Sequence, residues 1–114
     1  MLIKISTPNY IEGSESLTSH FQKNIESSLG HHSDIVTRLE VHFSDENGPK
    51  SGENDKRCMI EARIEGKKPM AVTHHSTSLD LALHGATEKL KRKLDSAVER
   101  LREHSQNGKE SNEV

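Results

Sequence analysis

The second half of the chain carries the clearest periodic pattern, an apolar stripe at helical spacing. Seven apolar residues recur three or four positions apart and so fall on one side of an α-helix of about six turns. They are Leu79, Leu83, Ala86, Leu90, Leu94, Ala97 and Leu101. Just before the stripe, Thr77 to Asp80 fits the capping-box pattern of a helix start. Gly85 interrupts the helix at a cost of about 1 kcal/mol relative to alanine.

A second helix is predicted in the first third of the chain. Its apolar residues lie four positions apart, at Leu17, Phe21, Ile25 and Leu29. Ser14 is a suitable N-cap residue, and Gly30 is a natural residue to follow the helix end. This segment is therefore predicted to bury one face only.

Four segments read as strands. Met1–Ser6 is rich in β-formers, and Ile35–Phe43 and Cys58–Glu65 alternate apolar and polar residues, as half-buried strands do. Gly66–Pro69 is a short hairpin connection to a fourth strand, Met70–His75. The order β-α-β-β-β-α predicts an α+β fold, a four-stranded sheet with both helices packed on one face.

Two polar segments fall outside these elements. Ser44–Arg57 contains no apolar residue and is predicted to be a long loop. Residues 104–114 contain one apolar residue and are predicted to be a disordered polar tail. The expected organisation is thus one domain, 1–103, followed by this tail.

Composition excludes several protein classes. The chain has 114 residues, of which 30% are hydrophobic, enough for one small core. Its longest apolar runs are about three residues, too short for a membrane-spanning helix or a secretory signal. The single cysteine, Cys58, has no partner for an internal disulfide and is expected on the inward side of its strand as a core residue. We therefore expect a cytoplasmic protein.

Charge is distributed unevenly on the long helix. The 16 Lys and Arg residues against 18 Asp and Glu residues give a formal net charge of −2, which excludes a uniformly basic coat. Yet a helical wheel places several cations on one flank of the apolar stripe, without a carboxylate among them. They are Lys89, Arg92, Lys93 and Arg100, whereas Lys91 lies on the opposite flank and Glu88, Asp95 and Glu99 cluster at the back. Such a strip either tracks phosphates or is an ordinary solvated face.

The sequence contains no recognisable catalytic or cofactor-binding motif. It lacks a nucleophile elbow, a phosphate-binding P-loop and a zinc-protease motif, so no enzyme and no cofactor are predicted. The pairs His31–His32 and His74–His75 are interpreted as surface histidines rather than metal ligands. His74 and His75 are neighbours on a strand and so point to opposite faces, whereas His31 and His32 follow a helix end, where the helix dipole favours a cationic histidine. The three aromatic residues, Tyr10, Phe21 and Phe43, are too few and too apolar in context for a base-stacking platform.

The element order and one segment of the long helix resemble a known family. Residues 79–94 read LDLALHGATEKLKRKL, and the preceding two strands show the alternation described above. Over roughly residues 1 to 102 the chain resembles the family of ribosome hibernation-promoting factor and ribosome-associated inhibitor A, also called the sigma modulation family, in its short form.

This resemblance implies a specific function. Members resemble double-stranded-RNA-binding domains and bind the small ribosomal subunit between head and body, over the tRNA and mRNA sites. They block initiation in stationary phase and under stress, through basic side chains that contact rRNA phosphates. The family motif matches Lys89, Arg92 and Lys93; Arg100 and Lys91 share the helix, and Lys23 is the cation of the first helix. No membrane, small-molecule substrate or metal is expected, and the free protein is expected to be monomeric. A regulatory protein-binding module, whose basic strip meets an acidic partner, remains the alternative.

Overall fold

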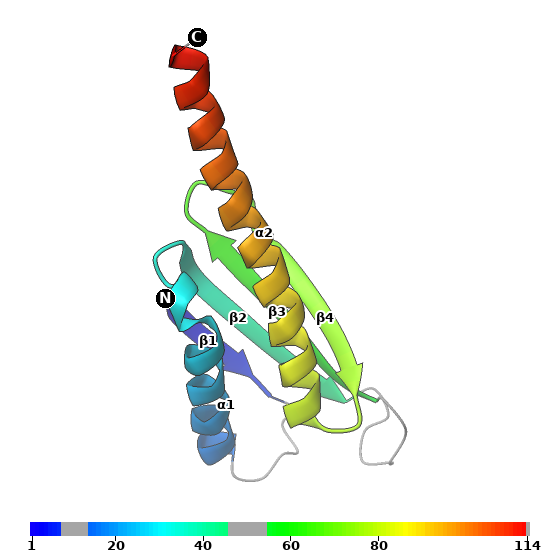
Figure 1. Cartoon of the computed structure of the whole chain (residues 1–114). Coiled ribbons are helices and arrows are strands. Elements are labelled where there is room, and N and C mark those ends of the chain that lie inside the picture. Colours follow the sequence, from blue (N-terminus) through cyan, green and yellow to red (C-terminus); the bar gives the residue numbers. More distant parts are fainter. Residues whose placement is uncertain (8–13, 46–54, 114) are drawn as a thin grey trace.

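One four-stranded sheet forms the body of the protein, and both helices cover the same face of it (Figure 1). The computed structural model describes the backbone of residues 1–7, 14–45 and 55–113, and the side chains of residues 1–7, 15–45 and 55–100. The elements are β1 (Leu2–Ser6), α1 (Ser14–Leu29), the 3₁₀ turn η1 (Gly30–His32), β2 (Val36–Asp45), β3 (Lys56–Ile64), β4 (Met70–Ser76) and α2 (Leu79–Glu113). The predicted α+β order is confirmed.

The sheet has the simple order β1-β2-β3-β4. β1 lies parallel to β2 because α1 carries the chain back along the sheet between them, whereas β2, β3 and β4 are joined as antiparallel neighbours. β1 and β4 are therefore the two edges of the sheet. α2 lies across β3 and β4, and α1 lies beside it on the β1 side (Figure 1).

The core lies between the helices and the inner face of the sheet, where both predicted helical stripes are buried. Phe21 and Ile25 of α1 are fully buried, as are Leu90 and Leu94 of α2. The inward residues of β2 and β3 complete it: Leu39, Val41, Phe43, Cys58, Ile60 and Ala62. The Phe21 and Phe43 rings meet with centroids 4.6 Å apart, so these aromatics are core residues, as predicted. Tyr10 lies outside the described residues.

The expected loop Ser44–Arg57 is shorter than predicted, because strand pairing continues into it from both sides. Asp45 of β2 pairs with Lys56 of β3, and Ser44 pairs with Arg57. The Lys56 ammonium lies 2.9 Å from an Asp45 carboxylate oxygen and 3.1 Å from one of Asp55. These ion pairs neutralise charges that would otherwise disfavour a strand. The central part of the predicted loop, 46–54, lies outside the described residues.

Both ends of α2 differ from the prediction. The N-cap is Ser78 and not Thr77, since the Ser78 hydroxyl accepts a hydrogen bond from the backbone N–H of Leu81 at 3.1 Å and its carbonyl accepts from Ala82. At the other end, α2 continues past Leu101 to Glu113, through the segment expected to be a disordered tail. That segment contains no proline, and extending an existing helix costs far less than starting one. The division at residue 103 stays a prediction.

Candidate nucleic-acid interface

Two lysines of α2 reach the open edge of the sheet. The Lys89 ammonium donates a hydrogen bond to the carbonyl oxygen of Thr73 at 2.8 Å, and Lys93 donates to that of Ala71 at 3.4 Å. Both lysines are exposed. The helical spacing that places them beside the apolar stripe therefore also aligns them along β4.

This arrangement covers an edge strand with positive charge. Among the described strands, β4 has a neighbour only on its β3 side, so the carbonyls of Ala71 and Thr73 on its other side lack a partner from these strands. Lysines over such an edge satisfy its carbonyls and oppose the addition of another strand. Each ammonium has three N–H donors and uses one here, which leaves two for an anion at the surface.

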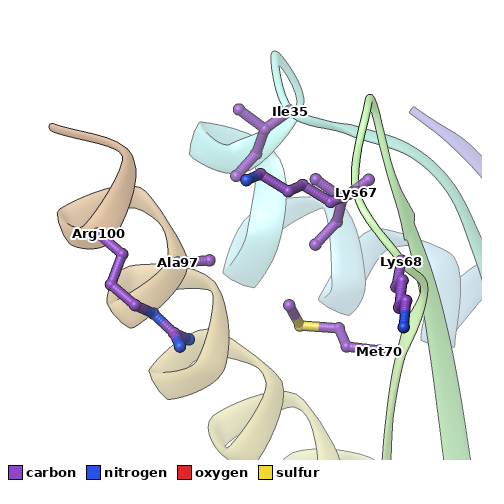
Figure 2. A pocket seen from close by; sticks show the side chains of 7 residues that line it. Ile35, Lys67, Lys68, Met70, Ala97 and Arg100 are labelled. Carbon is purple, nitrogen blue, oxygen red and sulfur yellow. The ribbon is translucent and has the colours of Figure 1, made fainter. Parts of the chain in front are cut away.

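Arg100 continues the positive surface toward the β3–β4 hairpin. It borders a cavity of about 520 Å³ whose apolar lining comes from Ile35, Ile64, Met70 and Ala97. The rim carries two further cations, Lys67 and Lys68, on the hairpin facing α2 (Figure 2). Three exposed cations thus surround an apolar hollow, and among the described side chains no carboxylate lines it.

Lys67 and Lys68 are residues that the sequence analysis missed. They belong to the turn after β3, in which Gly66 adopts a positive φ of 72° and Lys67 N–H donates to the carbonyl of Ile64. The one local signal was two consecutive lysines in a hairpin turn. Their relation to Arg100 depends on the packing of α2 over the hairpin, which sequence spacing does not reveal.

The remaining predicted site residues, Arg92, Lys91 and Lys23, differ in their exposure and in their position on the helices. Arg92 is exposed on α2, whereas Lys91 is half-buried on the other flank of the helix. Lys23 is exposed on α1, two positions from each of the buried residues Phe21 and Ile25, and so lies on the outer side of that helix. We define the basic flank as Lys89, Lys93 and Arg100 of α2 with Lys67 and Lys68 of the hairpin.

Two arginines elsewhere on the sheet are neutralised by carboxylates. On the outer face, Arg38 lies 3.0 Å from a Glu40 carboxylate oxygen and Arg63 lies 3.8 Å from one of Glu61. Within the described part of the chain, no carboxylate lies within ion-pair distance of any member of the basic flank. A chain of net charge −2 therefore presents a local surface that attracts anions.

The positive charges near the basic flank also affect the pKa of a neighbouring histidine, His74. His74 lies on β4 and packs against α2. Burial lowers the pKa of His74, and the positive charges of Lys89, His75 and His84 lower it further. His74 is therefore held neutral near pH 7, and the ammonium of Lys89 carries the charge at this point.

Two sequence expectations about reactive side chains have different outcomes. Cys58 is fully buried, and burial raises the pKa of its thiol to about 12, so it is a core residue as predicted. His32, expected at the surface, is instead buried at 5% exposure and lies 2.9 Å from an Asp95 carboxylate oxygen. The prediction was wrong there because the 3₁₀ turn η1 folds His32 under α2, against a residue 63 positions away.

No helix in the described part of the chain combines the length and apolar content needed to cross a membrane.

Searching curated proteins for similar sequences yields no significant match. The family model described as "Sigma 54 modulation protein / S30EA ribosomal protein" matches residues 3–102. The matched range includes the buried stripes of both helices and most of α2, the helix that carries part of the basic flank. That match covers the sheet from the second residue of β1 onward, together with the candidate interface. The chain therefore belongs to the sigma 54 modulation protein / S30EA ribosomal protein family, a family of ribosome-associated modulation factors.

Proposed function

We propose that this protein is a hibernation factor that binds the small ribosomal subunit in the intersubunit region, where tRNA and mRNA lie, and so inhibits translation in idle cells. The observation that carries this proposal is the basic flank, five cations without a carboxylate partner in the described part of the chain. Family membership supports association with the ribosome. The cytoplasmic location follows from the same proposal.

Phosphate contacts account for the binding without any reading of bases. Lys and Arg side chains on a rigid helix are well suited to bind successive phosphates, and such contacts fix position and orientation rather than sequence. The described part of the chain offers no row of exposed aromatic rings on which bases could stack, because Phe21 of α1 and Phe43 of β2 are buried in the core. Inhibition then arises from occupying the site, and no catalytic step is proposed.

Within this proposal, the contributions of the two helices are unequal. α2 supplies Lys89, Lys93 and Arg100, with Arg92 beside them on its exposed side. α1 supplies Lys23 alone, accompanied by Glu26 one turn later. We therefore expect the cations of α2 to make the main phosphate contacts, with Lys67, Lys68, Lys91 and Lys23 as minor contacts.

The alternative is a regulatory module on the same fold that binds an acidic protein. The net charge of −2 favours it, because a protein that binds rRNA over its whole surface is usually basic. In this case the basic flank would meet carboxylates of a partner, and purified ribosomes would not bind.

Co-sedimentation with purified ribosomal subunits in sucrose gradients tests the proposed function. If Lys89, Arg92, Lys93 and Arg100 each meet a phosphate, a plot of the logarithm of the binding constant against the logarithm of the salt concentration should have a slope of about −3.6. Raising salt from about 50 to 200 mM should then weaken binding on the order of 10²-fold. Absence of the protein from the small-subunit fraction at low salt would contradict the proposal and favour the alternative.

A further inference from the structure

Three side chains with metal-binding atoms converge on the side of α2 away from the basic flank. His31 and His32 belong to η1, and Asp95 belongs to the middle of α2. One nitrogen or oxygen from each lies within 4.8 Å of the others, and the two imidazole rings have centroids 4.2 Å apart. The fold therefore brings Asp95 to two histidines that lie more than 60 positions earlier in the sequence.

Further carboxylates surround the same place. A cavity of about 350 Å³ is lined by all three side chains together with Asp34 and Glu99. Asp95 and Glu99 are one helical turn apart, and like charges at this spacing destabilise a helix unless a cation neutralises them. Within the described residues no lysine or arginine forms an ion pair with either. The proposed ribosomal function makes no use of this acidic pair.

The bonding of His32 is incomplete in the protein alone. Its side chain is 5% exposed, and its Nε2 atom lies 2.9 Å from an Asp95 carboxylate oxygen. Its Nδ1 atom is buried and has no hydrogen-bond partner. Buried polar atoms in proteins nearly always have a partner, so Asp95 alone does not complete the bonding of the His32 ring.

We propose that His31, His32 and Asp95 bind a divalent transition-metal ion, and that its donor set is best suited to Zn²⁺. Two imidazole nitrogens and a carboxylate oxygen are typical zinc ligands, whereas Ca²⁺ and Mg²⁺ prefer sites made of oxygen alone. Asp34 or Glu99, which line the same cavity, or a water molecule would complete four-fold coordination. The bond between His32 and Asp95 is replaced by bonds from both to the ion.

The ion would fasten η1 to α2. The chain between His32 and Asp95 includes three of the four strands, so the ion would close a large part of the fold. Asp95 and Lys93 lie about 160° apart around the helix, so this site and the basic flank act independently. Metal binding is thus a property of the chain that does not depend on the ribosomal proposal.

Calorimetric titration of the full-length, tag-free, EDTA-treated protein with ZnCl₂ tests the proposal. We expect one equivalent to bind and the melting temperature to rise with zinc concentration, as for any ligand selective for the folded state. Co²⁺ should bind at the same stoichiometry and give the visible absorption of tetrahedral coordination. His31→Ala and Asp95→Asn should each weaken zinc binding roughly tenfold or more. Both residues are exposed, so these variants should fold, unlike one at the buried His32.

His20→Ala is the matched control. His20 also lies beside a carboxylate, with its Nε2 atom 3.1 Å from an Asp80 oxygen, but it is not part of the group of three ligands. We expect this variant to bind zinc as the wild type does. Zinc binding that is absent, that exceeds one equivalent without saturation, or that falls equally in His20→Ala and His31→Ala would overturn the proposal.

Discussion

The imidazole ring of His74 packs directly on the backbone of Gly85. A Cβ atom placed on residue 85 would overlap three atoms of that ring. Gly85 lies inside α2, and glycine is unfavourable inside a helix by about 1 kcal/mol relative to alanine. The close approach of β4 to α2 therefore explains a residue that helix propensity alone disfavours.

Gly85→Ala should destabilise the protein despite its better helix propensity. Backbone or ring movement to relieve the overlap should cost about 1–3 kcal/mol, more than the propensity gain. Urea denaturation of both proteins measures the difference. The double variant Gly85→Ala with His74→Ala should lose less stability, because the smaller side chain at residue 74 leaves space for the new Cβ atom. A single variant more stable than the wild type would show that the ring moves freely.

His74 should also make stability depend on pH. Its pKa is lowered in the folded state, first by burial and then by Lys89 and neighbouring histidines, so the unfolded chain binds the proton more tightly. The free energy of unfolding should therefore fall as the pH drops below the ordinary value of 6.5, and level off below the lowered pKa. His74→Gln should remove this part of the pH dependence. If the free energy of unfolding fell by the same amount in the variant and the wild type between about pH 7.5 and 5, this role of His74 would be contradicted.

Lys56 should stabilise the junction of β2 and β3. Its hydrogen bonds to Asp45 and then Asp55 raise the pKa of Lys56, and the two carboxylates are only 4% and 2% exposed. Lys56→Met keeps the apolar stem but leaves two buried carboxylates close together without their shared cation. We expect a lower melting temperature at pH 7 than in the wild type. Lys67→Met, which alters an exposed lysine in the turn, is the control and should melt as the wild type does.

The fold could be predicted from sequence because its information is local. Each buried stripe leaves a period that a short window detects: Phe21 and Ile25 on α1, Leu90 and Leu94 on α2. The ends of elements were harder, because they depend on single bonds. Ser78 and not Thr77 caps α2, although either residue type suits the position.

The candidate sites could be predicted only in part, because they combine distant segments. Lys89 and Lys93 were identified because their helical spacing alone places them together. Lys67 joins them only through the packing of the hairpin near Arg100, and His32 meets Asp95 only because η1 folds under α2. No pattern within a window of a few turns links residues so far apart in sequence.

The most direct test of the central claim compares the salt dependence of small-subunit binding in two double variants. Lys89→Gln with Lys93→Gln removes two charges from the basic flank, and the glutamine amides retain a donor near the β4 edge. Lys4→Gln with Arg63→Gln removes the same charge from exposed side chains on the outer face of the sheet. Circular dichroism should show that both variants fold.

Each lost phosphate contact should reduce the salt slope by about one unit. We predict that the salt slope falls from about −3.6 to about −1.8 in the flank variant, with a large loss of affinity at low salt. In the outer-face variant the slope should stay unchanged. Equal slopes in the two variants would mean that overall charge, and not the basic flank of α2, governs binding to the ribosome, and would contradict the account.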